Sequence, residues 1–290
     1  MRVPNSIISS NVTFGLGRLT TAMDRANLTI ASQRQILTMA DDPSALLQVM
    51  NLRSDMSYVD QLNRNIEMGR TWLTASESAL TNVEDLITEV KLLTVQMGSD
   101  NVGADERQAA AEAVQGFLET AVTLGNSTVG DRYIFAGSQN DSPAFTLAGT
   151  AVTYEGDSNP FAVRISRESS VTVGGDGGAI FGDLFTTLAD LKTALENNDG
   201  AAIRDQITNL DTAYDRIDGN ISRIGGRGVR LDARTSILAD VQLADTERLS
   251  SLEDVDYAEA AVELAAVETA YQAALSAASK VLNVSLVNYL

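Results

Sequence analysis

The residue types that perform most enzyme chemistry are missing from this chain. Its 290 residues include no Cys and no His, which excludes disulfides, thiolate and imidazole metal sites, Cys nucleophiles and Ser-His-Asp triads. Carboxylate pairs remain, such as Asp41 with Asp42 and Glu253 with Asp254, and such pairs can in principle exchange protons with a substrate. A helix cap and a solvated helix start explain them better. We therefore predict no catalytic residue.

Two glycine-rich segments could in principle bind an ion or a phosphate. Residues 174–178 resemble one calcium-binding repeat, but the repeat occurs once and Ala179 stands where an Asp should be, so a plain turn is favoured. Residues 225–228 lack the Gly-Lys-Ser/Thr ending of a phosphate-binding loop and lie within a helical pattern. We assign no metal and no cofactor to either segment.

The composition predicts a helical protein that does not bind nucleic acid. Asp and Glu number 39 against 21 Lys and Arg, a net charge of −18, which disfavours nucleic acid or an anionic membrane surface as the main partner. Hydrophobic residues make up 44% of the chain but aromatic residues only 5%, which is typical of packed helices. Residues 1–40 contain one acidic residue, Asp24, and residues 269–290 one charge, Lys280. We expect a partner to cover these charge-poor ends.

No targeting or membrane-spanning segment is expected. The start of the chain has no continuous apolar region and no Ala-x-Ala cleavage site, and no stretch reaches about 18 apolar residues. Residues 269–290 are interrupted by Gln272, Asn283, Asn288 and several Ser, which indicates an interface helix. We expect neither a cleaved signal peptide nor membrane insertion.

Apolar residues at helical spacing predict two long helices at the start of the chain. Steps of four and three residues from Val12 to Leu37, with one polar position at Gln33, indicate an amphipathic helix within residues 1–40. Asp42 then caps a second helix that begins at Pro43 and has its last apolar position at Met97. At 1.5 Å per residue an unbroken helix over residues 43–97 is about 80 Å long, which predicts an elongated molecule.

A change of pattern predicts a small β-rich insert in the middle of the chain. A third helix, over about residues 105–128, folds back on the second. β-prone runs then occur between turn-forming residues, and we interpret residues 131–182 as the insert. The runs are residues 133–137, 144–147, 152–154, 161–165 and 171–173. Helical spacing resumes over residues 183–256, with a kink or break expected at residues 225–228, since each Gly costs about 1 kcal/mol in a helix.

The last helix, residues 257–290, carries an apolar side like that of the first. The two helical parts between the ends, residues 41–130 and 183–256, form a rod. The remote terminal helices can bury their stripes only against each other or against another copy. We therefore predict that both ends interact with other subunits. The predicted interaction residues are Val12, Leu16, Leu19, Met23, Ile30, Leu37, Leu264, Tyr271, Leu275, Leu282, Leu286 and Tyr289.

Three sequence blocks resemble one known family. They are Met39-Ala40-Asp41-Asp42-Pro43-Ser44-Ala45, the block Tyr133-Ile134-Phe135-Ala136-Gly137 with its flanks, and the ending Ser285-Leu286-Val287-Asn288-Tyr289-Leu290. Together they resemble the flagellar hook-associated protein 3 family, whose members are relatives of flagellin. The resemblance covers about residues 1–140 and 200–290. Its most specific part is the block at residues 133–137, because flagellins share the helical ends but do not usually carry it.

The resemblance implies a mainly α, flagellin-like helical bundle with a β-rich insert, and a structural role instead of an enzymatic one. It implies a hook–filament junction protein, extracellular and exported by the flagellar type III apparatus without cleavage. The implied partners are copies of the chain in a ring, the preceding hook-associated protein, flagellin, and an export chaperone on the C-terminal helix. Two alternatives remain open: a filament-forming flagellin, and an exported coiled-coil protein such as a secretion-needle tip protein or adhesin.

Overall fold

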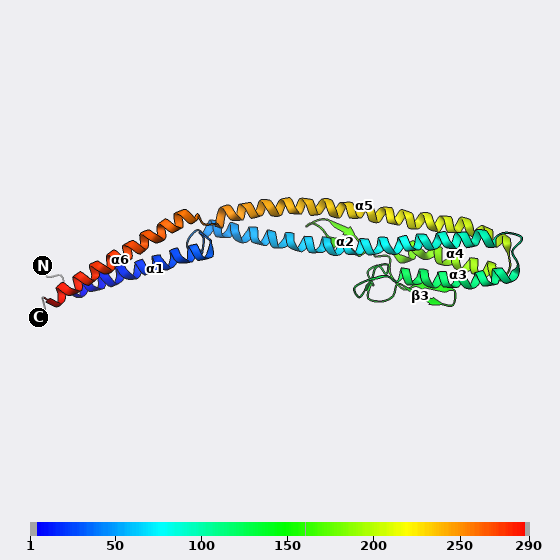
Figure 1. Ribbon diagram of the computed structural model, residues 1–290, viewed down its shortest axis with the longest axis horizontal. Helices are drawn as coiled ribbons and strands as arrows, with labels where there is room; N and C mark the ends of the chain where they lie inside the picture. The colour runs from blue at the N-terminus through cyan, green and yellow to red at the C-terminus, as the bar shows by residue number, and fades with distance from the viewer. Residues whose placement is uncertain (1–4, 160, 288–290) are drawn as a thin grey trace. The chain divides into compact units, whose positions relative to one another are not determined.

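The chain is mainly helical with a small strand-containing middle region, as predicted. The computed structural model describes the backbone of residues 5–159 and 161–287 and the side chains of residues 7, 10–159 and 161–280. Within these residues six helices form (Figure 1): α1 (Asn5–Ser32), α2 (Pro43–Met97), α3 (Ala104–Gly125), α4 (Gly177–Glu196), α5 (Gly200–Glu253) and α6 (Tyr257–Val287). Six short strands lie between α3 and α4: β1 (Thr128–Val129), β2 (Arg132–Tyr133), β3 (Phe145–Ala148), β4 (Ala151–Tyr154), β5 (Ala162–Arg164) and β6 (Ser170–Thr172).

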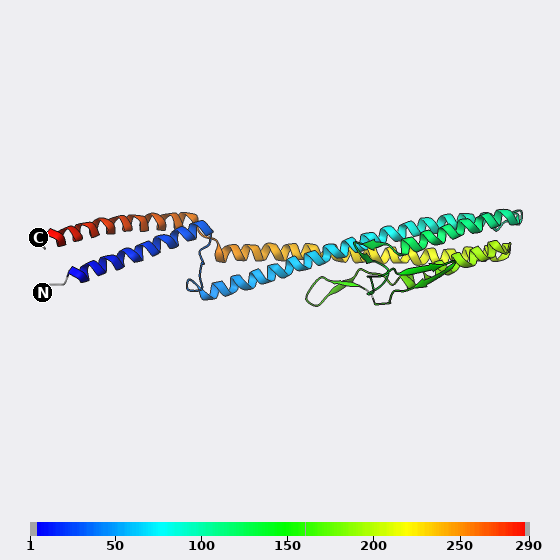
Figure 2. The same ribbon diagram turned by 90° about the horizontal axis from the view of Figure 1, so that it is seen from below.

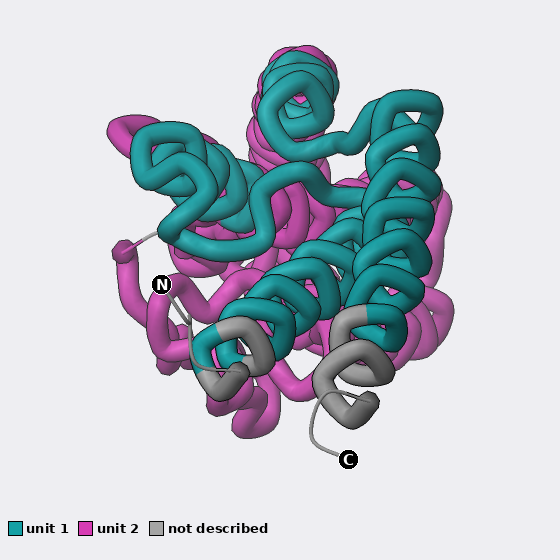
Figure 3. Tube along the Cα trace, turned by 90° about the vertical axis from the view of Figure 1, so that its left-hand side faces the viewer, with its two compact units in different colours: residues 1–57, 241–290 teal, residues 58–240 magenta. Residues whose placement is uncertain are grey.

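The chain divides into two compact units, coloured separately in Figure 3. One comprises residues 1–57 and 241–290, and the other comprises residues 58–240. In the first unit α1 and α6 lie side by side and run antiparallel (Figures 1 and 2). In the second unit the inner parts of α2 and α5, together with α3, α4 and the strands, enclose one hydrophobic core.

The start of α2 forms as the sequence predicts. Asp42 Oδ1 accepts hydrogen bonds from the backbone N–H groups of Ser44 and Ala45, at 2.9 Å each, and from the Ser44 hydroxyl. These bonds satisfy N–H groups that have no partner within the helix. They also lower the pKa of the Asp42 carboxyl. The helix then continues unbroken to Met97.

The first helix is shorter than predicted. It ends at Ser32, and Gln33 adopts a left-handed conformation with φ 61°. The chain leaves the helix here because the Gln35 N–H donates to the Glu253 carbonyl at 2.8 Å, while the Val255 N–H donates to the Gln33 carbonyl at 3.2 Å. The prediction that Gln33 and Leu37 extend the first helix is therefore wrong.

The predicted kink at residues 225–228 is also wrong, because α5 runs through this segment without a break. On either side of the glycines, Ile224 is 7% exposed and Leu231 is fully buried in the core. Burial of these two side chains holds the helix on the rest of the unit and offsets the poor helix propensity of glycine.

We therefore predict that Gly226→Ala stabilises the protein by about 0.5–1 kcal/mol. Gly226 is exposed, and a Cβ there would meet no atom within 4 Å. The matched substitution Gly69→Ala should destabilise the protein, because its Cβ would lie 2.8 Å from Val163 Cγ2. Urea denaturation of the two variants measures whether each substitution raises or lowers the free energy of unfolding. A less stable Gly226→Ala variant would mean that α5 is strained at this point.

The middle region contains three separate antiparallel hairpins, β1–β2, β3–β4 and β5–β6. The run predicted at residues 133–137 is a strand only at Tyr133. Helix α4 begins at Gly177, before the predicted end of the insert, because Asp176 caps it by accepting a hydrogen bond from the Ala179 N–H. The glycine-rich segment at residues 174–178 thus leads into a helix cap.

Candidate assembly surface

The terminal helices α1 and α6 meet through a seam that buries mainly small residues. Among the described side chains of the two helices, the buried ones are Ala26 on α1, and Ala260 and Ala278 on α6. The larger residues predicted on this stripe are only partly buried: Val12, Leu16, Leu19, Met23, Ile30, Leu264 and Tyr271. Contact between small residues buries little apolar area, so the pair is weakly held on its own.

Large apolar side chains remain open to solvent on both helices. Phe14 and Leu28 of α1 are 70% and 59% exposed, and Val262 and Leu275 of α6 are 70% and 52% exposed. Leu275, which the sequence analysis placed on the stripe, therefore lies at its edge. Apolar surface gathered on two adjacent helices is typical of a protein-binding face. We call the exposed and half-buried apolar surface of α1 and α6 the assembly face.

Some predicted interaction residues cannot be placed on this face. The side chains of Leu282 and Leu286 and the whole of Tyr289 lie outside the described residues. Leu37 is partly buried in the segment after α1, so it belongs to the connection between α1 and α2.

Asp41 organises that connection. Its Oδ2 accepts hydrogen bonds from the Leu37 and Thr38 N–H groups at 3.0 and 2.8 Å, and its Oδ1 binds Arg25 at 2.5 Å. The two backbone N–H groups and the guanidinium favour the charged carboxylate, so they lower the pKa of Asp41. Asp41, Asp42 and Pro43 thus fix the turn between the two helices.

Glu253, which the sequence analysis read as part of a solvated helix start, is instead the last residue of α5 and only 6% exposed. Its carboxylate receives Arg34 Nε at 2.8 Å and Arg53 Nη2 at 2.6 Å. Both arginines come from the N-terminal part of the chain, so this carboxylate ties the start of the chain to the end of α5. Its neighbour Asp254 accepts a hydrogen bond from the Ser250 hydroxyl.

The block Tyr133-Ile134-Phe135-Ala136-Gly137 is a structural element of the second unit. Ile134, Phe135 and Ala136 are at most 1% exposed. The Phe135 ring packs edge-on against Phe181 at 5.0 Å between centroids, and the Phe135 carbonyl accepts hydrogen bonds from the Gly177 N–H and the Tyr154 hydroxyl. Burial, followed by the nearby Asp176 charge, raises the pKa of Tyr154 to about 12, so its hydroxyl remains a donor.

Gly137 ends the block in a conformation that requires glycine. Its φ is 69°, and a Cβ would lie 2.2 Å from the Asp157 carbonyl oxygen. The Asp157 carboxylate accepts hydrogen bonds from the N–H and hydroxyl of Ser138 and from the N–H and side-chain amide of Asn159. Those of Ser138 have the largest effect, and together they lower the pKa of Asp157 to about 2.

The low pKa of Asp157 predicts an acid-sensitive contribution to stability. Since it lies below the ordinary value of 3.8, the carboxylate stabilises the fold fully above about pH 4, and the effect disappears as the pH falls through about 2. We expect Asp157→Ala to lower the midpoint temperature of thermal unfolding at pH 6. The difference between the midpoints of the variant and the parent protein should become smaller as the pH falls from 4 to 2. A difference that does not change with pH would show that the charge is not responsible.

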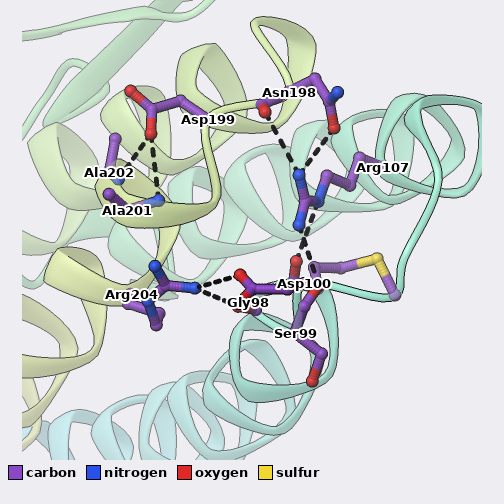
Figure 4. Close-up of polar contacts among 10 residues, drawn as sticks. Gly98, Ser99, Asp100, Arg107, Asn198, Asp199, Ala201, Ala202 and Arg204 are labelled. Atoms are coloured by element: carbon purple, nitrogen blue, oxygen red, sulfur yellow. Dashed lines mark hydrogen bonds and ion pairs between the residues drawn. The ribbon is translucent and has the colours of Figure 1, made fainter.

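Arg107 and Arg204 are not among the residues predicted from the sequence, and they join two turns at one end of the second unit (Figure 4). Arg107 is 5% exposed and donates to the Met97 and Ser99 carbonyls, at 3.0 and 2.9 Å, and to the side-chain oxygen of Asn198 at 2.6 Å. Arg204 donates to the Gly98 carbonyl at 2.7 Å. A lone arginine one turn into a helix after a glycine-containing turn is the only sequence signal for this role.

Neither a metal centre nor a membrane span is found in the part of the chain that the structure describes. No three acidic side chains there come together as a candidate metal site, and none of the described helices combines the length and apolar character needed to cross a bilayer. The arrangement of the terminal helices is instead suited to burying apolar surface against other protein.

Comparison with known proteins matches both ends of the chain. The bacterial flagellin N-terminal helical region matches residues 3–140, and the bacterial flagellin C-terminal helical region matches residues 207–290. Flagellar hook-associated protein 3 of Salmonella typhimurium is 25% identical over 260 residues, 79% of this chain and 80% of the relative. The Escherichia coli protein of that name is 23% identical over 289 residues, 89% of each chain. The crystal structure of flagellar hook associated protein-3 from Legionella pneumophila superposes with a TM-score of 0.65 at 13% identity, covering 70% of this chain and 98% of that one.

Proposed function

This chain belongs to the flagellin family, and we propose that it is a structural subunit that joins the flagellar hook to the filament. The observation that carries the proposal is the assembly face. Among the described side chains of α1 and α6 the buried ones are small, and Phe14, Val262 and Leu275 are more than half exposed. The pair therefore needs neighbouring subunits to complete its packing.

The junction role is favoured over a filament role by two observations. The similar proteins with 25% and 23% identity are both named flagellar hook-associated protein 3, and each match extends over most of both chains. Ile134, Phe135 and Ala136 of the block at residues 133–137 are buried in the core of the middle region, and this block is the most specific part of the resemblance to the hook-associated family. A filament-forming flagellin remains the alternative.

The partners follow from this role. We propose that copies of the chain form a ring, which contacts the preceding hook-associated protein on one side and flagellin on the other. The protein would be exported without cleavage and act outside the cell as a structural component and not as an enzyme. Before export, a small chaperone would cover the exposed face of α6 around Val262 and Leu275, the same surface that later faces other subunits.

A deletion strain of the source bacterium tests this function. Cells without the chain should keep their hooks but release flagellin into the medium, because the filament has no junction on which to start. Reintroducing the chain should restore filaments. Filaments of normal number and length in the deletion strain would contradict the proposal.

A further inference from the structure

Two ion pairs, separated by three steps of seven residues along each helix, link α2 and α5 in the second unit. Arg70 of α2 binds Asp232 of α5 at 2.6 Å, and Lys91 of α2 binds Asp211 of α5. Positions seven residues apart recur on the same side of a helix that packs lengthwise against another. The two helices run antiparallel (Figure 1). Between the two ion pairs, each helix therefore has two further positions at the same seven-residue spacing.

The two intervening positions hold carboxylates without a cation. Seven-residue steps place Glu77 opposite Gly225, and Glu84 opposite Asp218. Burial, followed by the charges of Asp218 and Asp85, raises the pKa of Glu84, and Glu84 Oε1 has no hydrogen-bond partner. In the described part of the chain none of Glu77, Glu84 and Asp218 forms an ion pair. We call these three residues the acidic rungs. The surface beside Glu77 is open, because a Cβ at Gly225 would meet no atom within 4 Å.

The other flank of α5 carries the opposite charge. Five arginines follow one another in steps of seven, four, three and four residues, which keeps them in one stripe along the helix. They are Arg216, Arg223, Arg227, Arg230 and Arg234. The ends of this arginine stripe bind Asp183 of α4 and the Ile165 carbonyl beside β5. Around the axis of α5 the stripe lies about half a helical turn from Asp218, the one acidic rung on this helix.

The middle of the arginine stripe lacks counter-charge. Arg223 donates to Asn220 of the same helix, and among the described residues no carboxylate pairs with Arg223, Arg227 or Arg230. Burial and the charges of the other two arginines lower the pKa of Arg227. Three arginines held close together without an acid, in a chain of net charge −18, repel one another and attract an acidic partner.

We propose that the arginine stripe of one copy docks on the acidic rungs of a second copy. The chain supplies both halves of the contact. Three unpaired arginines lie on one flank of α5, and the three unpaired carboxylates lie on the other side, Asp218 on α5 and Glu77 and Glu84 on α2. Because the two surfaces differ and point in different directions, the contact is head-to-tail and repeats from copy to copy. The inference rests on the self-assembly proposed above, and it names the surfaces in residues 58–240 through which neighbouring copies recognise each other.

Charge reversal in the full-length protein tests this contact. Sedimentation at about 0.01 M salt, where charges act over about 30 Å, should show self-association of the parent protein that weakens with added salt. Reversing either flank should weaken association about tenfold or more, because like charges then meet. An equimolar mixture of the two variants should associate again, since each supplies the charge that the other lost. The variants are Arg223→Glu with Arg227→Glu and Arg230→Glu, and Glu77→Lys with Glu84→Lys and Asp218→Lys.

A matched control changes the net charge equally at a different place. Asp105, Glu112 and Glu119 are exposed on α3, and replacing all three by Lys should leave association as in the parent protein. The mixture also controls for folding, because misfolded variants would not associate on mixing. A parent protein that stays monomeric at about 1 mM, or a mixture no stronger than its components, would overturn the inference. Sedimentation of the purified protein tests the contact between copies, whereas the deletion strain tests the junction role. Either proposal can therefore fail without the other.

Discussion

Replacing Phe135 by alanine should destabilise the second unit by about 3–5 kcal/mol, the usual cost of removing a large buried ring. The Phe135 side chain is 1% exposed and packs on Phe181, which also contacts Phe145 and Phe185. Removing the ring leaves a cavity in this aromatic cluster, since backbone hydrogen bonds hold the segment in place and prevent it from collapsing. Urea denaturation followed by circular dichroism measures the loss.

The control for this prediction is Phe14→Ala. Phe14 is 70% exposed on α1, so its removal should change the free energy of unfolding by no more than about 0.5 kcal/mol. If Phe135→Ala costs less than about 1 kcal/mol, the block at residues 133–137 is not central to the packing of the middle region. The residues of the block would then need an explanation other than core packing.

Replacing Leu275 by aspartate should leave the isolated chain unchanged and yet abolish filaments. Leu275 is 52% exposed in the single chain, so the new carboxylate can stay in contact with water there. In the assembled state the proposed function requires the assembly face to be covered, and an unpaired carboxylate buried at such a contact costs several kcal/mol per subunit. Thermal unfolding of the purified variant and counts of filaments per cell give the two halves of the result.

Ser276→Asp is the matched control for this second prediction. Ser276 is the next residue along α6, exposed and already polar, and the same charge there should be tolerated. Normal filaments with Leu275→Asp would place Leu275 outside the subunit contacts, and a large drop in the stability of the isolated variant would mean that Leu275 is needed for the fold of a single chain.

Local signals were sufficient to predict some elements of the fold. The bounds of α2 follow from the Asp42 cap, Pro43 at the first helical position and Gly98 after Met97, all of which act within a few residues. The apolar stripe of α1 likewise follows from helical geometry, which puts Val12, Leu16 and Leu19 on one face, and all three side chains are half-buried in the structure.

Contacts between distant residues explain where the sequence predictions were wrong. Nothing near Gln33 signals the end of α1, which is set by hydrogen bonds to residues 253 and 255. Gly226 should weaken a helix, but burial of Ile224 and Leu231 on either side holds it straight. Ile134 and Phe135 have high strand propensity, yet Gly175 and Gly177 form hydrogen bonds with the backbone of residues 134–137 and make this segment a buried connection.

The position of the protein along the flagellum tests the central claim most directly. The chain contains no Cys, so a single cysteine at the exposed Ala148 of β3 gives a unique site for thiol-reactive gold. Electron microscopy of flagella carrying Ala148→Cys should show label in one band where the hook meets the filament. Label distributed along the whole filament would contradict the junction role and identify the chain as a filament subunit.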